Sequence, residues 1–369
     1  MTNPKHTLLS DWQAFCQALA DAGEEVFAAN VPDNEQVQAE GVRYLSRMAR
    51  AALEWYVEYN DPAFPVLYRP AHETIKLGAD NPDNVYLKAV LDGQYDYVIT
   101  GTRGTVDYIS FSTSKGSYAD NFKQIETGFL DGNDLEVLED GRFEIIVSPR
   151  EHTGNWLRAE GDSQSLLVRQ TYKDRAAETA ADLSIRRRDQ GPAPAPLNAE
   201  GFGADLGKAT AFFTNTVALF ARWSEQIQEH PNQLPLWDQA FCQSVGGDPN
   251  ITYYHGYFKL LPNEALLIEI SHIPPCKTWN IQIDNYWMES LDYRYHRVSL
   301  NAHTAKPNPD GSITLVLSPE DNGHPNWLST AGHHEGSLCF RWVGARELVH
   351  PATKHIALQD APVELHTAS

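Results

Sequence analysis

The feature that most constrains the fold of this chain is an internal duplication. The stretch DGRFEIIVSP at 140–149 recurs as DGSITLVLSP at 310–319, with Asp, Gly, Ser and Pro in matching places. An Asn-Trp-Leu triplet follows each copy, beginning at Asn155 and at Asn326. The matched landmarks keep one order and lie 170 to 172 residues apart. Such agreement predicts two copies of one structural unit.

Each copy is rich in β-forming residues. Arg169 in LLVRQ matches Arg341 in LCFRW, so the two units cover about 85–175 and 255–345. Short apolar runs bounded by Asp-Gly, Gly-Thr and Ser-Pro are typical of strands joined by turns. Single strands do not alternate with helices, as a parallel sheet requires. We therefore predict an α+β, mainly β protein with two related antiparallel β-sandwich-like units, each preceded by helices.

The duplication also helps to separate structural from functional residues. A residue present in both copies most simply serves the fold that the copies share. On this argument Trp156 and Trp327 are apolar anchors, whose indole N–H groups each need one acceptor. Arg169 and Arg341 are expected to satisfy carbonyls or a carboxylate near the Asn-Trp-Leu turn. Residues that occur in one copy only are better candidates for a site.

Helical periodicity fills the segments before and between the β units. It covers much of the first sixty residues and returns over about 205–229. We also expect a helix at 174–190, with three arginines in its last turn, where cations suit the helix dipole. The proline- and glycine-rich stretch at 191–203 is predicted to be a linker. These patterns divide the chain into four regions: 1–80, helical; 81–175, first β unit; 176–250, helical linker region; 251–369, second β unit.

Composition favours a soluble protein. With 42% hydrophobic and 21% charged residues, the chain resembles an ordinary globular protein. A formal net charge of −20 argues against binding nucleic acid or an anionic membrane. The four cysteines are scattered, the first residues lack a signal-peptide pattern, and no apolar run approaches the ~20 residues of a membrane span. We therefore expect a cytoplasmic protein.

Several longer motifs carry a resemblance to a known family. They are NPDNVY at 81–86, GNWLRAEGD at 154–162, SLDYRYHRVSLN at 290–301 and PNWLSTAGHHEGSLCFRWV at 325–343. With them, the chain resembles the bacterial family catalogued as domain of unknown function 1214. It is especially similar to the long members with a helical N-terminus and two β units, over about 40–350. The resemblance implies a mostly β fold, and it brings no activity and no catalytic residue.

The strongest single-copy stretch is DNYWMESLDYRYHRVSLN at 284–301. If 291–300 is a strand, then Asp292, Arg294 and His296 project from one face. A histidine beside a carboxylate can exchange protons near neutral pH, and the arginine can stabilise developing negative charge. His296 would be the acid or base and Asp292 its orienting partner. The alternative is a ladder of cross-strand charges on a solvated face.

Further candidates are aromatic or imidazole side chains that could line a pocket. They could equally be strand aromatics that pack on a helix, or loop residues. The candidates for binding a substrate are Tyr253, Tyr254, His255, Trp287, Tyr293, His333 and His334. No HExxH or His-Cys pairing is present, and the adjacent His333 and His334 point in opposite directions in a strand, so we expect no metal.

These observations favour an enzyme of hydrolase or lyase type. It would act on a small, largely apolar metabolite by hydrolysis or elimination, through acid–base chemistry without a cofactor. The alternative is a non-catalytic protein that binds a carbohydrate or another small ligand. In either case the expected partner is a small molecule, with no nucleic acid and no membrane, and a homo-oligomer is allowed.

Overall fold

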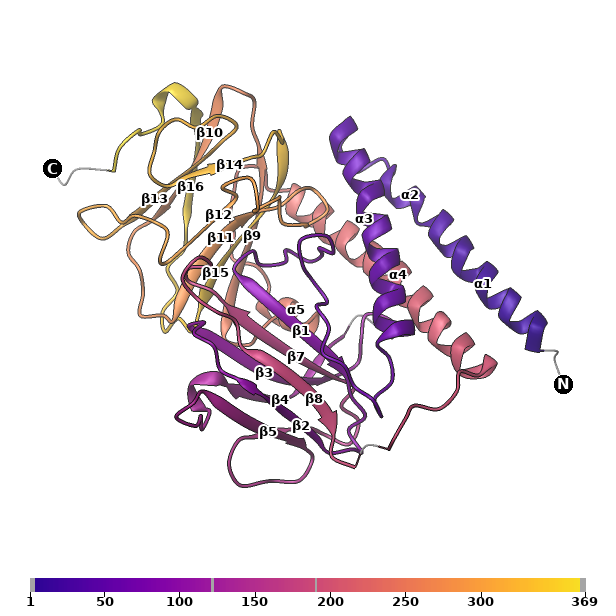
Figure 1. The fold of residues 1–369 in the computed structure, drawn as a ribbon. Coiled ribbons are helices and arrows are strands. Elements are labelled where there is room, and N and C mark those ends of the chain that lie inside the picture. The colour runs from indigo at the N-terminus through magenta and orange to yellow at the C-terminus, as the bar shows by residue number, and fades with distance from the viewer. Residues whose placement is uncertain (1–3, 121–122, 190, 366–369) are drawn as a thin grey trace.

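The chain folds into two similar β units with helices along one flank (Figure 1). The computed structural model describes residues 4–120, 123–189 and 191–365. Each unit contains two four-stranded sheets. The predicted class, mainly β with two related sandwich-like units preceded by helices, is confirmed.

The first unit pairs its strands in the orders β1-β7-β3-β4 and β6-β5-β2-β8. The bounds of these strands are β1 Asn84–Val90, β2 Tyr97–Thr102, β3 Tyr108–Lys115, β4 Ile125–Asp131, β5 Arg142–Ser148, β6 Trp156–Arg158, β7 Ser165–Thr171 and β8 Asp182–Arg187. The second unit has the orders β12-β11-β15-β9 and β14-β13-β10-β16. Its strands are β9 Ile251–Lys259, β10 Glu264–Ile270, β11 Thr278–Ile283, β12 Ser299–Asn301, β13 Ile313–Ser318, β14 Trp327–Ser329, β15 Glu335–Val343 and β16 Ala352–Ala357.

The two units have the same topology, which confirms the duplication. In the first pair of equivalent sheets, the order β1-β7-β3-β4 corresponds strand by strand to β9-β15-β11-β12. The second sheets match in the same way. Each contains one parallel pair, in which Ile146 lies opposite Trp156 and Val316 opposite Trp327. The repeated sequence therefore specifies a repeated strand order, including its unusual parallel pair.

The Asn-Trp-Leu triplets fix equivalent turns, as predicted. The Asn326 amide donates to the carbonyls of Lys306 and Thr314, and the Asn155 amide donates to those of Glu136 and Glu144. The indole of Trp327 donates to Ser318, and that of Trp156 donates to the Ser148 carbonyl. Each triplet thus satisfies backbone groups of its own unit, and its role is structural.

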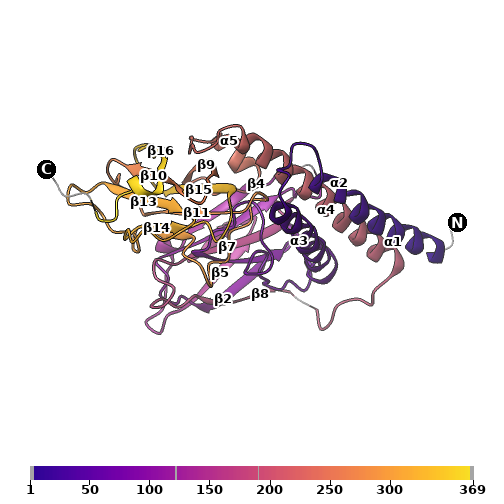
Figure 2. The same ribbon diagram turned by 90° about the horizontal axis from the view of Figure 1, so that it is seen from above.

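The helices lie together on one side of the β units. Figures 1 and 2 show α1, α3 and α4 side by side. Side-chain caps begin two of them, because Asn34 accepts N–H groups at the start of α3 and Asn198 does so for α4. The helices are α1 Pro4–Asp21, α2 Gly23–Val26, α3 Glu35–Leu53, α4 Ala199–Gln228 and α5 Gln239–Ser244, with a π-helical turn at Glu54–Glu58 and short 3-10 turns at Gly132–Asp134 and Leu358–Asp360.

The predicted helix at 174–190 is wrong. Residues Asp182–Arg187 form strand β8, which pairs with β2 at the edge of the first unit. Leu183 and Ile185 pack against the core of that unit, while alternate residues are exposed. Burial on a period of two has therefore overridden the helical propensity of the alanine-rich sequence. The first unit accordingly extends beyond 175, and the end of the predicted linker belongs to α4.

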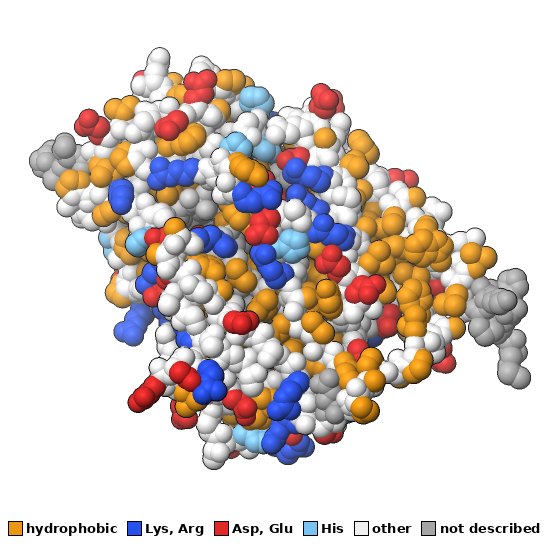
Figure 3. Space-filling view, viewed as in Figure 1, with side chains coloured by type: hydrophobic (Ala, Val, Ile, Leu, Met, Phe, Trp, Pro, Cys, Tyr) orange, Lys and Arg blue, Asp and Glu red, His pale blue; other side chains and the backbone are white. Residues whose placement is uncertain are grey.

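Four apolar clusters are found among the described residues. One lies inside each β unit, a small one involves β10 and β13, and the largest joins the helices to β9 and β15 of the second unit. Figure 3 also shows hydrophobic side chains gathered over the helical flank, where Leu9 and Trp12 of α1 are about half exposed. No helix among the described residues is long and apolar enough to cross a membrane.

Candidate functional site

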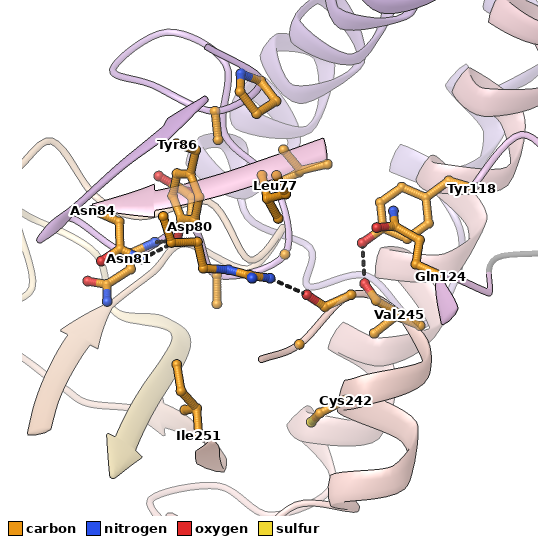
Figure 4. Close-up of a pocket in the computed structure, with 18 of the residues that line it drawn as sticks. Leu77, Asp80, Asn81, Asn84, Tyr86, Tyr118, Gln124, Cys242, Val245 and Ile251 are labelled. Atoms are coloured by element: carbon orange, nitrogen blue, oxygen red, sulfur yellow. Dashed lines mark hydrogen bonds between the residues drawn. The ribbon is translucent and has the colours of Figure 1, made fainter. Parts of the chain in front are cut away.

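A cavity of about 180 Å³ lies where the two β units and the helices meet, and we call it the central cavity. Figure 4 shows Asn81, Asn84 and Tyr86 on one side of it and Tyr118 and Gln124 on another. Helical residues and loops close it with Trp55, Leu77, Phe220, Trp223 and Cys242. The strands β1, β7, β9 and β15 contribute Asn84, Tyr86, Lys88, Ser165, Leu167, Arg169, Ile251, Tyr253, His255 and Arg341.

The repeated arginines meet in this cavity and link the two units reciprocally. Arg169 of the first unit donates to the carbonyl of Gly246, just before the second unit, at 2.6 Å. Arg341 of the second unit donates to the carbonyl of Ala79, just before the first unit, at 2.5 Å. The expectation that both lie near the Asn-Trp-Leu turn is wrong. They do satisfy carbonyls, but at the interface between the units.

The segments that receive these hydrogen bonds are equivalent. Ala79 has φ 56° and Gly246 has φ 96°, so each chain turns through the left-handed region before the next strand. A few residues later, the N–H of Asn81 donates to the Tyr86 hydroxyl at 3.1 Å. The N–H of Asp248 donates to the Tyr253 hydroxyl at 2.9 Å. Both repeats therefore build the same loop around an arginine and a tyrosine.

The pleat of the strands explains why these side chains face the cavity together. Tyr86 lies opposite Arg169 in the register of β1 and β7, and Tyr253 lies opposite Arg341 in that of β9 and β15. Directly paired residues project from the same face of a sheet. The alternate residues, such as Ala89 in the first unit, enter the sandwich cores instead. Each unit thus turns one polar face toward the cavity.

Positive charge in the cavity is incompletely compensated. Arg169 has Asp248 at 3.9 Å. Arg341 donates to Gln282 and Ala79, and among the described residues no carboxylate lies within 4.0 Å of it. Lys88 likewise has no ion pair within the described parts of the chain, and its ammonium group lies 5.1 Å from the centre of a Trp55 ring. Arg341 and Lys88 are thus cations of the cavity without a close carboxylate among the described residues, although Asp80 also lines this cavity.

Lys88 and His255 occupy equivalent positions in the two units. Each follows its tyrosine by two residues on the same face, in β1 and in β9. Burial lowers the pKa of Lys88 to about 8. Burial, helped by Arg341, lowers the pKa of His255 to about 3, so its ring is neutral at pH 7. The Trp223 ring lies 4.9 Å from the His255 ring and forms an aromatic wall with it.

Four cavity-lining side chains carry buried polar atoms without a hydrogen-bond partner among the described residues. They are Trp55 Nε1, Asn84 Oδ1, Trp223 Nε1 and His255 Nδ1. Buried polar atoms are almost always paired, because an unmade hydrogen bond costs about 1–3 kcal/mol. The packing therefore leaves four polar atoms beside the cavity shielded from solvent and unpaired within the described part of the chain.

A second hollow of about 400 Å³, which we call the side cavity, adjoins the first. Both are lined by Trp55, Lys88 and Ser165. The side cavity continues past Tyr68 and Asp120, toward the π-helical turn and the start of α4. Lys88 therefore stands at the junction of the two spaces.

The predicted catalytic strand at 291–300 is wrong, because the segment forms turns and only Ser299–Asn301 is β12. The Asp292 carboxylate accepts from the backbone N–H and the guanidinium of Arg294, and its carbonyl accepts the N–H of His296. These local bonds favour a turn over a strand. Arg294 and His296 are exposed, and none of the three residues lines the central or side cavity.

The predicted binding residues divide between the cavity and the cores. Tyr253 and His255 line the central cavity. Tyr254, between them, points into the core of the second unit, as alternation along a strand requires. Trp287 is fully buried, and its indole donates to the Val37 carbonyl of α3 at 2.8 Å. Tyr293 lies beneath the Lys76 ammonium, 4.7 Å from it, and lines neither cavity.

The adjacent histidines have different surroundings. His333 is buried, with Nε2 3.0 Å from the Glu40 carboxylate of α3 and Nδ1 2.8 Å from the Thr330 carbonyl. Burial disfavours protonation of His333, but Glu40 outweighs it and raises the pKa. His334 is exposed. Neither lines the central cavity, and within the described residues no three His, Cys, Asp or Glu side chains are grouped as a metal site needs.

The sequence argument did not predict most of the residues that line the central cavity, because it gave residues present in both copies, such as Arg169 and Arg341, a structural role. A signal was present in the sequence, since NPDNVY at 81–86 and DPNITY at 248–253 are also copies, 167 residues apart. In both copies a proline lies between two residues that are Asp or Asn, and a tyrosine ends the motif. This motif and the repeated arginines mark the two halves of the cavity. A residue shared by two copies can therefore serve a site that the copies build together.

A solved structure with 48% identity agrees with this architecture. The model for the protein family of unknown function DUF1214 matches residues 263–347, inside the second unit. The crystal structure of an uncharacterised protein from Burkholderia cenocepacia has 48% identity and a TM-score of 0.94, covering 96% of this chain and 99% of that one. A crystal structure from Vibrio parahaemolyticus has 13% identity and a TM-score of 0.49, covering 92% and 100%. No curated protein matches. The chain belongs to the DUF1214 family.

Proposed function

We propose that this protein binds a small molecule with a carboxylate or similar anionic group and an apolar body in the central cavity. The observation that carries the proposal is the entry of Arg341 and Lys88 into one cavity without a carboxylate partner among the described residues. Arginine has five N–H donors, and two of those on Arg341 bind the protein. The remaining donors suit a carboxylate.

The walls of the cavity support the second half of the proposal. Trp55, Leu77, Phe220 and Trp223 provide apolar surface beside the cations. A site with apolar walls and a few converging polar groups is the usual design for a small ligand.

The proposal includes a cytoplasmic location and no partnership with nucleic acid or membrane. The four cysteines have free thiols, as is usual in a reducing compartment, and the net charge is −20.

Acid–base catalysis on the same ligand, such as hydrolysis or elimination, is a second candidate. Asp80 lines the cavity, and burial raises its pKa to about 6, close to the pH at which a carboxyl group can exchange protons. Asp80→Asn would then abolish turnover of an ester ligand while keeping its binding. The exposed His296, with Asp292 and Arg294, lies outside this cavity, so the candidate no longer depends on it.

A matched pair of ligands tests the binding proposal. By calorimetry, 3-phenylpropionate should bind at least tenfold more tightly than 3-phenylpropan-1-ol, which lacks the carboxylate. Lys88→Met should weaken binding of the acid by roughly tenfold, since about 1.4 kcal/mol corresponds to that factor. Lys354→Met, at an exposed lysine, is the control and should change nothing. Equal affinity for acid and alcohol would overturn the proposal.

A further inference from the structure

Lys88 is placed unlike an ordinary binding lysine. It is half-buried on β1, beside a tryptophan ring, at the junction of the central and side cavities. Its ammonium group makes no hydrogen bond or ion pair within the described part of the chain. Asp92, Asp120 and Asp162 line the side cavity too, but within the described residues none of them forms an ion pair with Lys88. A lysine removed from water without an ion pair gives up its proton more readily, and the free amine is a nucleophile.

We propose that Lys88 forms a Schiff base with a 2-oxo acid, a molecule whose ketone or aldehyde carbon is bonded to a carboxylate. The inference rests on the proposed function, because the arginines must hold the carboxylate. The neutral amine attacks the carbonyl carbon, and a proton moves from nitrogen to oxygen to give a carbinolamine. Loss of one water then forms the carbon–nitrogen double bond. Nothing is oxidised or reduced.

The strand register brings the required groups together. Lys88 lies opposite Leu167, and Arg169 is two residues further along the same face of β7. Such diagonal neighbours are about 7–8 Å apart between Cα atoms, within reach of two long side chains. In a 2-oxo acid the reacting carbon adjoins the carboxylate. The register places Arg169 near the Lys88 amine, and although Arg169 has Asp248 at 3.9 Å, Arg341 lines the same cavity from the other unit and can share the carboxylate.

The lowered pKa of about 8 supports the same chemistry. At pH 7.5 roughly a quarter of such an amine is neutral, whereas an ordinary lysine with a pKa of about 10.4 is almost wholly protonated. Lys88 should therefore react faster than exposed lysines, although it is less accessible than they are.

Lys76 provides a matched internal control. It is more deeply buried than Lys88, and its ammonium group donates to the Ser290 carbonyl, the Ser290 hydroxyl and the Leu291 carbonyl at 2.5, 2.9 and 3.1 Å. All three of its donors are used, so its nitrogen has no lone pair to offer while these bonds persist. Burial alone would make the two lysines alike, whereas the proposal makes only Lys88 reactive.

The experiment is reductive trapping of the full chain. The protein is incubated with phenylpyruvate and cyanoborohydride at pH 7.5, which reduces an imine to a stable secondary amine, and labelled lysines are quantified by peptide mass spectrometry. Lys88 should be labelled at least tenfold more than Lys76 and more than the exposed Lys354. Phenylacetone, which lacks the carboxylate, should label Lys88 at least tenfold less. Added 3-phenylpropionate should suppress the labelling.

The outcomes separate this inference from the proposed function. If 3-phenylpropionate binds but Lys88 is labelled no more than Lys354, the Schiff base is refuted and the binding site stands. If 3-phenylpropionate does not bind and labelling of Lys88 is equal with phenylacetone, both ideas fail. Selective, carboxylate-dependent labelling of Lys88 supports both.

Discussion

At the scale of single residues, Arg341 joins stability to binding. Its guanidinium is buried and bonds to Ala79, which precedes the other β unit, and to Gln282 of β11. The groups it satisfies would be left buried and unpaired if it were removed. The same residue therefore holds the two units in place and supplies charge to the cavity between them.

We expect Arg341→Met to lower the free energy of unfolding by about 2–4 kcal/mol, because two buried acceptors lose their donors. Arg294→Met is the control, since that arginine is exposed and its one ion pair among the described residues is with Asp292, two positions away. Exposed ion pairs contribute little, so this variant should unfold like the parent. Urea titration followed by tryptophan fluorescence measures both. Equal midpoints for the two variants would show that Arg341 does not link the units.

At the scale of elements, helix α3 is fastened to the second unit by polar contacts as well as by its apolar face. The Glu40 carboxylate lies 3.0 Å from His333, and Arg47 donates to the buried Glu289 at 2.6 Å. The Trp287 indole adds a hydrogen bond to the helix backbone at Val37. The loops before β15 and β12 thus fix α3, whose C-terminal end leads into the π-helical turn that brings Trp55 to the central cavity.

The raised pKa of His333 gives this attachment a pH dependence. A histidine whose folded pKa exceeds its unfolded value adds stability below about pH 6.5, and that stability is lost as pH rises through the folded pKa. His333→Gln should therefore reduce the loss of stability seen between pH 6.5 and 8. His334→Gln, at the exposed neighbour, should leave the profile unchanged. Urea midpoints across this range test the prediction, and identical slopes in all three proteins would contradict it.

Helices and strands could be predicted from the sequence where their own residues carried a clear periodicity or a clear turn motif. The amphipathic helices and the repeated strands follow directly from periodicity and turn residues. Strand β8 did not, because it follows an alanine-rich stretch that favours a helix and its paired residues lie 80 to 90 positions earlier in the chain. The turn at Asp292 was missed because a carboxylate that bonds its own neighbouring backbone leaves no periodic trace. The cavity was missed because it belongs to neither unit alone.

At the scale of the whole molecule, the units are joined too closely to behave independently. Reciprocal arginine bonds cross the interface, and the largest apolar core includes residues of the helices and of the second unit. We expect one cooperative heat-absorption peak, with equal calorimetric and van't Hoff enthalpies, although the chain is longer than most two-state proteins. Differential scanning calorimetry checks this. Two separated peaks would show that the β units unfold as independent domains.

Lys88 and His255 occupy equivalent positions in the two β units but differ in chemistry, so the two halves of the central cavity are not equivalent. In a dimer of identical subunits, both halves of a shared site are obliged to be the same, so an unsymmetrical guest can enter either way round. Here both halves belong to one chain, and each has its own residue at the equivalent position. One half presents an amine and the other a neutral ring. The proposed ligand, which has one charged end, is therefore expected to bind in a single orientation.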